Sequence, residues 1–241
     1  LATAARAASA EEAEALAALP LGANRRVGAC IAERLPGGEL RLQELALALE
    51  EPVAIAATPL VLVDVIEAGA GPIYASLDSG GFLRITRAVR KTNLLTGAET
   101  VRLVQGELEL EFPSGAGAPR WLLLSGQGDC VFLLWEDGAL WRCDARDFKA
   151  MQVAEKTDLL PEEGVRATAV SFLIGRSSLV LGDSLGRLRV WFRIKPADAG
   201  TADGAVLALA HELVSSGSPV LALAPSGRGR MLAAGHADGS A

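Results

Sequence analysis

Apolar and polar residues alternate in short runs along most of this chain, and glycine-rich turns separate the runs. The stretch 179–192, LVLGDSLGRLRVWF, is one example. There an apolar run leads into an Asp-Ser-Leu-Gly turn, and a second run then alternates with arginine. A period of two is typical of β-strands, and glycine supplies the positive φ that a tight hairpin turn needs. The pattern therefore predicts a β-hairpin at 179–192.

The same combination of apolar run, glycine turn and alternating run recurs along the chain at irregular steps of about 40 to 55 residues. The last glycines of the five turns are Gly38, Gly81, Gly138, Gly186 and Gly239. Repeats of this length, each with room for four short strands, are typical of β-propeller blades. The sequence therefore predicts an all-β fold, a β-propeller-like array of four-stranded antiparallel blades. The array is expected to be partial or open, because about five units are visible and the fifth is incomplete.

The clearest unit spans residues 167–213. Its four expected strands, from the inner to the outer one, are ATAVSFLIG, SSLVLGDS, GRLRVWFRI and GAVLALAHELV. The segment 220–239 repeats the first half of this unit: apolar strand, Gly-Arg turn, apolar strand, acidic-Gly turn. In the third strand one face holds Leu188, Val190 and Phe192, and the opposite face holds Trp191 and the arginines. One of these faces is expected to pack on a neighbouring blade.

The first twenty residues have a different texture. SAEEAEALAAL is rich in alanine, Ser9 stands three residues before Glu12 as in a capping box, and Pro20 would end a helix. We therefore predict an N-terminal helical lead-in at 1–20 and a β-propeller-like domain at 21–241 that is truncated in its last blade. A final hairpin turn without a return strand would leave backbone groups unpaired, so we expect a longer parent chain.

The charge balance gives no sign of a nucleic-acid partner. The net charge is −6, the isoelectric point is about 5.1, and carboxylates lie between the arginines. No apolar run reaches the roughly 18 to 20 residues that a membrane span needs, and the chain does not begin like a signal peptide.

Three cysteines are present, Cys30, Cys130 and Cys143. None belongs to a CxxC pair or stands near a histidine at zinc-ligand spacing, so no metal site is predicted. Cys130 and Cys143 flank one predicted hairpin turn, and they are expected to lie diagonally on one face. Diagonal positions are usually too far apart for a disulfide, so we expect two buried thiols, with a bridge as the alternative.

Side chains suited to catalysis are few. The chain has two histidines, His211 and His236, and one tyrosine, Tyr74. His211 is expected on an outer strand and His236 in a turn, hydrogen-bonded to backbone, with a dyad of His236 and Asp238 as the alternative. Ser184 in GDSLG is not expected to be a nucleophile, because a strand and not a helix follows it.

The remaining polar motifs point to turns and solvated faces. The run 125–130, SGQGDC, lacks the lysine of a phosphate-binding loop, so Ser125 is expected in a turn between two strands. Three carboxylate pairs are expected to be solvated: Glu11-Glu12, Glu50-Glu51 and Glu162-Glu163. An arginine row is expected to be solvated or paired with acids, with phosphate binding as the alternative: Arg187, Arg189 and Arg193. We therefore predict no catalytic, cofactor-binding or metal-binding residue and no enzymatic activity.

The unit 168–192 resembles a blade of the WD40 family, which runs from an apolar inner strand through an Asp-x-x-Gly turn to a closing tryptophan. Trp191 stands where that tryptophan stands. Phe192 replaces the usual aspartate, so the family's structural His-Asp network is not carried over.

The chain also resembles a propeller-like periplasmic insert of bacterial phosphate ABC transporter permeases. The residues that carry this resemblance are 166–194, 219–239 and 90–101. It implies a non-catalytic interaction domain at the periplasmic face of the inner membrane, in a parent chain that is embedded in the membrane. The partners it implies are the phosphate-binding protein and other transporter subunits. No transport residue is implied, because the family's membrane helices are not present here.

Two other functions stay open. One is a cytoplasmic WD40-like scaffold for protein–protein interactions, which would be flanked by further blades. The other is a propeller hydrolase, which would need several His, Asp and Glu side chains in one funnel. The three cysteines weigh mildly against an oxidising periplasm.

Overall fold

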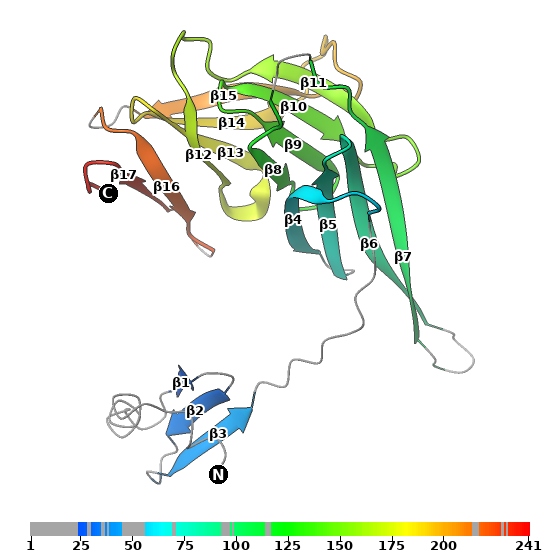
Figure 1. The fold of residues 1–241 in the computed structure, drawn as a ribbon, viewed down its shortest axis with the longest axis vertical. Helices are drawn as coiled ribbons and strands as arrows, with labels where there is room; N and C mark the ends of the chain where they lie inside the picture. Colours follow the sequence, from blue (N-terminus) through cyan, green and yellow to red (C-terminus); the bar gives the residue numbers. More distant parts are fainter. Residues whose placement is uncertain are drawn as a thin grey trace. The chain divides into compact units, whose positions relative to one another are not determined.

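The computed structural model describes residues 24–27, 30–34, 37, 39–44, 56–68, 71–92, 97, 99–113, 117–213, 217–227, 229 and 231–241. The chain divides into two compact units, Leu1–Val53 and Ala54–Ala241 (Figure 1). This division falls inside the predicted β-propeller-like domain, whose boundaries stay a prediction. The predicted helical lead-in at 1–20 lies outside the described residues.

The first unit contains a three-stranded antiparallel sheet in the order β1-β2-β3. Its strands are β1 (Asn24–Val27), β2 (Cys30–Arg34) and β3 (Leu40–Glu44). β2 and β3 form the hairpin that the sequence predicts around its first glycine turn.

The second unit contains three four-stranded antiparallel sheets and one two-stranded sheet, and in each of them consecutive strands are neighbours. The first sheet holds β4 (Leu60–Ala68), β5 (Gly71–Asp78), β6 (Phe82–Thr92) and β7 (Glu99–Glu109). The second holds β8 (Trp121–Leu124), β9 (Cys130–Leu134), β10 (Ala139–Asp144) and β11 (Gln152–Asp158). The third holds β12 (Ala167–Phe172), β13 (Ser178–Asp183), β14 (Leu188–Ile194) and β15 (Val206–Leu213). The fourth holds β16 (Val220–Pro225) and β17 (Leu232–His236).

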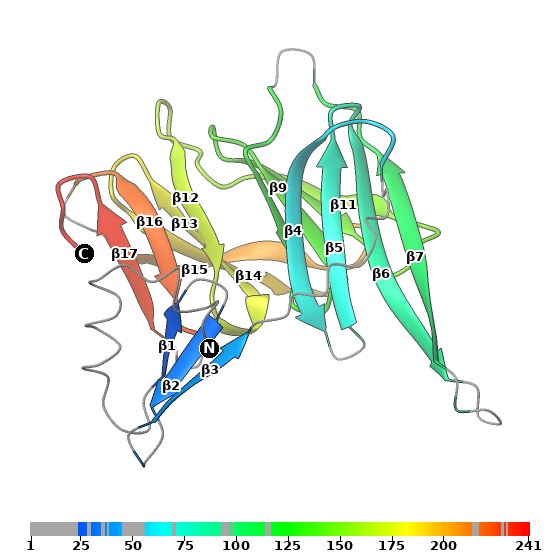
Figure 2. The same ribbon diagram turned by 60° about the horizontal axis from the view of Figure 1, so that its bottom comes forward.

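This topology confirms the predicted fold class, and the four strands expected for 167–213 are those of the third sheet. The sheets follow one another as blades, with β4 in contact with β8 and β12 in contact with β16 (Figure 2). A short 3₁₀ turn, η1 (Ile174–Arg176), links β12 to β13.

Two apolar cores lie between the first three sheets, and the second sheet contributes to both. Val131 and Leu133 of β9 belong to the core shared with the first sheet. Phe132 and Leu134 belong to the core shared with the third sheet. Successive side chains of a strand point to opposite faces, so all five residues of β9 are buried. Burial of each large apolar side chain stabilises the fold by about 1.5–3 kcal/mol.

The tight turns between second and third strands depend on glycine. Gly138 has φ 95°, and a Cβ atom there would lie 2.6 Å from Cβ of Leu160. Gly81, Gly186 and Gly239 at the corresponding turns also have positive φ, as the hairpin pattern predicts. Gly38 lies outside the described residues.

The expected placement of Cys130 and Cys143 on one face is wrong. The register of β9 and β10 pairs Cys143 with Val131 and Cys130 with Asp144. Because neighbouring positions point to opposite faces, the thiols lie in different cores. Both cysteines are free and buried, as expected, and burial raises the pKa of each thiol to about 12. The side chain of Cys30 is not among those described.

The fourth sheet packs closely on the third at Gly182, where the third sheet has no side chain. Gly182 of β13 lies against Val220 of β16, and a Cβ atom at Gly182 would come within 2.6 Å of that of Val220. Val220 is fully buried by this contact. The fourth sheet is therefore attached to the third sheet through β16, its inner strand.

Candidate functional site

Each complete sheet holds a buried arginine that pairs with a glutamate directly opposite it on the outer strand. The Nε–Oε2 distances are 2.5 Å for Arg84–Glu107, 2.8 Å for Arg142–Glu155 and 2.7 Å for Arg189–Glu212. All three pairs are cross-strand partners in the register. These arginines therefore bind the third strand to the outer strand, and their charge is neutralised within the sheet.

Arg142 is the most completely buried of the three. Its guanidinium also donates to both carboxylate oxygens of Asp203, at 2.5 and 2.9 Å, and to the carbonyl oxygen of Ala205. Burial alone would raise the pKa of Asp203, but the hydrogen bonds from Arg142 and from the Ala205 N–H outweigh it and lower the pKa to about 2. The second sheet is thereby linked to the loop that precedes β15.

In each complete sheet the residue three positions before the turn glycine meets the residue three positions after it. Asp78 accepts a hydrogen bond of 2.5 Å from Arg84, and Asp183 lies 3.9 Å from Arg189. The second sheet has two tryptophans at these places, Trp135 and Trp141, whose ring centroids are 5.3 Å apart. In each complete sheet these two positions therefore hold side chains that attract each other, either a carboxylate and an arginine or two tryptophan rings.

The carboxylate of Asp78 is stabilised in its charged form. Arg84 and Thr58 hold the pKa of Asp78 well below its usual range, and the N–H groups of Gly80 and Phe82 add to the effect. These clusters are not among the sites predicted from the sequence. The available signal is the Gly-x-Leu-Arg pattern after two of the turns, at 81–84 and 186–189.

The arginine row at and just before β14 is paired with carboxylates, as expected. Arg187 lies 2.8 Å from Asp183, Arg189 binds Glu162 and Glu212, and Arg193 lies 3.4 Å from Asp129. Glu162 is exposed, but the expectation that it is merely solvated is wrong. It binds both Arg187 and Arg189, and Arg189 above all lowers the pKa of Glu162. Glu11-Glu12 and Glu50-Glu51 lie outside the described residues.

His211 is exposed on the outer strand β15, as the sequence predicts. His236 is the last residue of β17, one position before the turn in which it was expected. Nδ1 of His236 donates to the carbonyl oxygen of Ser218 at 3.0 Å, which confirms the backbone hydrogen bond. The carboxylate of Asp238 accepts hydrogen bonds from the N–H and the hydroxyl of Ser240.

The candidate serines are part of turns. The Ser125 hydroxyl donates to Asp129 at 2.5 Å and accepts from the N–H groups of Asp129 and Cys130, between β8 and β9 as expected. The Ser184 hydroxyl accepts a hydrogen bond from the N–H of Arg166. Tyr74 is partly exposed on β5.

The carboxylate of Asp64 connects the first three sheets of the second unit. Asp64 of β4 accepts the N–H of Leu124 at 2.8 Å and a hydrogen bond from the guanidinium of Arg176. Arg176 also donates to the carbonyl oxygen of Val65, at 3.1 Å. Its backbone φ is 50°, a conformation that few residues other than glycine adopt. Arg176 therefore combines an unfavourable backbone conformation with a side chain that is bound to Asp64.

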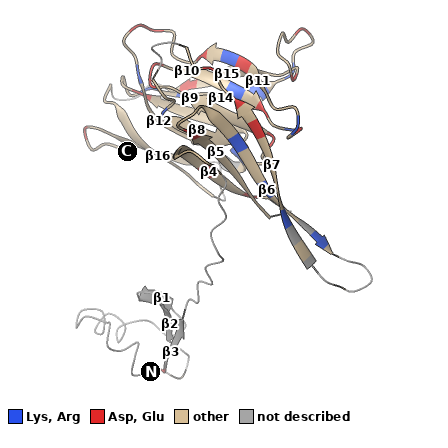
Figure 3. Ribbon diagram, turned by 45° about the vertical axis from the view of Figure 1, so that its right-hand side comes forward, with Lys and Arg blue, Asp and Glu red and all other residues tan. Residues whose placement is uncertain are grey.

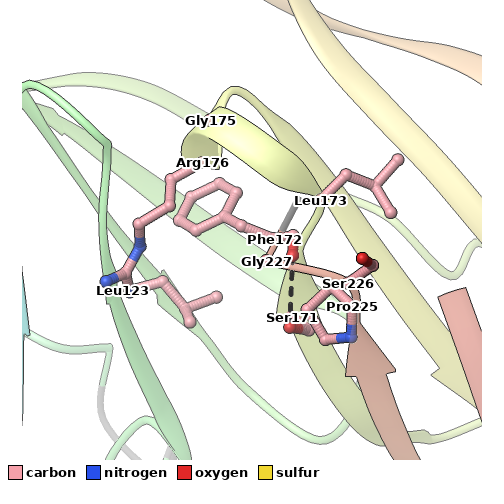
Figure 4. Close-up of a pocket in the computed structure, with 9 residues that line it drawn as sticks. All are labelled: Leu123, Ser171, Phe172, Leu173, Gly175, Arg176, Pro225, Ser226 and Gly227. Atoms are coloured by element: carbon pink, nitrogen blue, oxygen red, sulfur yellow. Dashed lines mark hydrogen bonds between the residues drawn. The ribbon is translucent and has the colours of Figure 1, made fainter. Parts of the chain in front are cut away.

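A cavity of about 320 Å³ lies beside this contact (Figure 4). Its walls come from β8, β12, η1 and β16, and include Leu123, Phe172, Leu173 and Pro225. Arg176 is the titratable residue of this lining, and its guanidinium is bound to Asp64. Across the described part of the chain, no group of three or more His, Cys, Asp or Glu side chains is placed to hold a metal ion. No helix among the described residues has the length and apolar character to cross a membrane.

Large apolar side chains are exposed on the sheets at either end of the second unit. Six belong to the first sheet: Leu60, Val61, Val63, Val65, Tyr74 and Leu103. Five belong to β14, β15 and β16: Phe192, Ile194, Leu209, Leu213 and Leu221. The second sheet has none among its described residues. Charged residues of both signs are interspersed on the third strand β6 and the outer strand β7 of the first sheet (Figure 3).

No protein-family model and no curated protein matches the chain. Solved structures are similar to it, among them the following two. The β-propeller domain of Cps50 (Swd1) from Myceliophteria thermophila has a TM-score of 0.49 and 12% identity, over 88% of this chain and 65% of that one. The C-terminal WD40 domain of Sif2 has a TM-score of 0.47 and 13% identity, over 86% and 52%. The chain thus spans less than two thirds of either structure, and the fold assignment rests on its own strand topology.

Proposed function

We propose that this chain is a non-catalytic domain that binds other proteins through the exposed apolar faces of its first and last sheets. The observation that carries the proposal is the distribution of exposed apolar side chains. Val63 is 62% exposed in the first sheet and Leu221 is 62% exposed in the fourth, while the second sheet has no such residue within the described chain. Apolar patches on a water-exposed surface are typical of interaction sites.

The chemistry of the polar side chains supports a non-catalytic role. The thiols of Cys130 and Cys143 are buried and protonated at neutral pH. The buried arginines are neutralised by carboxylates of their own or adjacent sheets. His236 is held by a backbone carbonyl group.

Site-specific photo-crosslinking in the source cell tests the proposal. A benzophenone amino acid at Val63 or at Leu213 should give discrete protein adducts. The same group at Leu185 is the matched control, because Leu185 is 49% exposed but lies in the turn between β13 and β14. Adducts at neither Val63 nor Leu213, or equal labelling at Leu185, would exclude binding through the terminal sheets.

A narrower proposal places the domain in an inner-membrane phosphate permease, on the periplasmic side. Its support is the resemblance of residues 166–194 and 219–239. The parent sequence decides between this context and a cytoplasmic scaffold, because flanking apolar spans favour the first and further blades favour the second. Calorimetry with inorganic phosphate is expected to give no heat of binding, since Arg187, Arg189 and Arg193 already have acidic partners.

A further inference from the structure

The third and outer strands of the first sheet extend beyond its other two strands. β5 pairs with only the first part of β6, up to Arg87, whereas β6 and β7 stay paired as far as Thr92 and Glu99. Residues 88–92 and 99–103 therefore form a two-stranded arm with no third strand beside it among the described residues. The arm projects from the sheet in both views (Figure 1, Figure 2). Its strands belong to a complete four-stranded sheet, so the arm does not arise from a missing strand.

Three cationic side chains follow one another along one face of this ladder. In the register, two positions separate Arg87 from Arg102, and two more separate Arg102 from Lys91. Side chains at every second position of a ladder share a face, so these three form one row. Ile85, two residues before Arg87, is buried in the core between the first two sheets. The basic row, Arg87, Arg102 and Lys91, therefore continues the inner face of the first sheet onto the arm.

The basic row has no acidic partner among the described residues. Every other arginine of the second unit whose side chain is described forms an ion pair. Arg84, on the same strand as Arg87, lies opposite Glu107 at 2.5 Å. The residues opposite the basic row are uncharged: Val104, Val89 and Thr100. The charge of the row is therefore not neutralised by the described part of the chain.

Packing fixes the start of the basic row. The guanidinium of Arg87 lies over the ring of Phe148, 4.8 Å from its centroid. A ring in this position holds the cation without neutralising it. Nε of Arg87 is buried and has no hydrogen-bond partner within the described chain. Arg102 and Lys91 are exposed, so the row leads from this fixed position out along the arm.

The spacing of the row matches an extended peptide. Two residues along a strand cover about 6.6 Å, and alternate side chains of an extended peptide repeat at the same interval. Acidic residues at three alternate positions can therefore face Arg87, Arg102 and Lys91 in turn. A nucleic acid would extend past the three cations and meet a chain whose net charge is −6. A short acidic segment avoids that repulsion.

We propose that the basic row binds an extended acidic segment of a partner protein, with aspartate or glutamate at three alternate positions. The central carboxylate faces Arg102, and charge-assisted hydrogen bonds hold the segment along the arm. This inference goes beyond the proposed function, because the basic row and the exposed apolar faces contain different residues. Leu103, the exposed apolar residue of the arm, lies on the opposite face of the ladder. Either surface can therefore fail as a binding site while the other stands.

Peptide titration of the full chain, followed by amide chemical shifts, tests the proposal. The probe is the capped seven-residue peptide Thr-Glu-Thr-Glu-Thr-Glu-Thr. The spacing control has the same composition with its three glutamates consecutive. We expect saturable shifts at Val89, Lys91 and Arg102 with the alternating peptide, and at least threefold weaker binding of the spacing control.

Substitutions of the central cation locate the site. Arg102→Gln should weaken the alternating peptide about threefold and Arg102→Glu about tenfold, because the first loses an exposed ion pair and the second replaces it with repulsion. A peptide with lysine at its central position should prefer Arg102→Glu to the natural chain. Lys195→Glu is the matched control, since Lys195 is also exposed and the change in net charge is the same. It should alter the affinity less than twofold.

Three results would overturn the proposal. The first is absence of binding at about ten millimolar peptide with the chain folded, which would leave the row as a charged edge that opposes strand pairing. The second is equal binding of the two glutamate peptides, or an equal effect of Lys195→Glu, because attraction would then be unspecific. The third is tighter binding of a single-stranded oligonucleotide that Arg102→Glu abolishes, which would assign the row to nucleic acid. Crosslinked adducts at Val63 that persist in Arg102→Glu would leave the proposed function standing in each case.

Discussion

Replacing Arg142 by methionine should destabilise the second unit strongly. The side chain of Arg142 is fully buried and binds Glu155, Asp203 and the carbonyl oxygen of Ala205. Methionine has a similar volume, so the change removes charge and hydrogen bonds with little loss of packing. Two buried carboxylates then remain without their cation. Such a change typically costs about 3–5 kcal/mol of unfolding free energy.

The pH dependence of stability should also change sign. In the natural chain the pKa of Asp203 is lowered from 3.8 to about 2, which corresponds to about 2 kcal/mol of stability. This contribution is complete above about pH 5 and is lost progressively as the pH falls through 3.8 and then 2. In Arg142→Met, burial acts without the opposing guanidinium and raises the pKa of Asp203 above its usual value. Protonation then favours the folded state, so the variant should gain stability between pH 7 and pH 4.

Urea unfolding followed by tryptophan fluorescence at pH 7 and pH 4 measures both effects. Arg146→Met is the matched control, because Arg146 also pairs with an aspartate, Asp144, but its side chain is about half exposed. The control should change stability little at either pH. A loss below about 1 kcal/mol for Arg142→Met, with the pH profile of the natural chain, would refute the assignment of Arg142 as the buried link between the sheets.

Three further changes test the packing of the sheets. Gly182→Ala places a Cβ atom 2.6 Å from that of Val220, so it should cost about 1–3 kcal/mol and speed hydrogen exchange across β16 and β17, whereas Gly200→Ala, which meets open space, should not. Asp64→Ala removes the acceptor of the Leu124 N–H and of Arg176, and should lower the unfolding free energy by about 1–3 kcal/mol in a chemical denaturation series. Cys130 and Cys143 should resist a thiol reagent at pH 7 until the protein unfolds, since burial raises their pKa to about 12, and rapid labelling of either in the native protein would contradict their placement.

The sequence predicts well those elements whose structure depends on neighbouring residues in the chain. The turn glycines need positive φ and the strands alternate with period two, so the hairpins around Gly81, Gly138 and Gly186 could be located from neighbouring residues alone. The register of β9 and β10 has no such local cause. A shift of one residue moves a side chain to the other face, and this is why Cys130 and Cys143 were placed together wrongly.

The polar contacts of the candidate site join residues that are far apart in the chain. Arg142 and Asp203 are 61 residues apart, and Asp64 and Arg176 are 112 residues apart. No spacing rule relates such residues, because their proximity depends on how successive sheets are set beside one another. The exposure of Phe192 of β14 is likewise not decided locally. This side chain is 41% exposed although it alternates like a core residue, because burial depends on which sheet lies beside it.

The position of a sheet in the array therefore determines how much of its apolar surface is exposed. The second sheet uses both faces for packing, and its charged residues Arg142 and Lys156 are engaged with Asp203 and with the ring of Trp141. The first and last sheets have one face each that no described sheet of the second unit covers. In a fold built from repeated sheets, the same alternating pattern is buried where two sheets face each other and exposed where no described sheet covers it. Substitutions that weaken binding without unfolding the protein should therefore lie on the terminal sheets, at positions whose equivalents in the second sheet are buried.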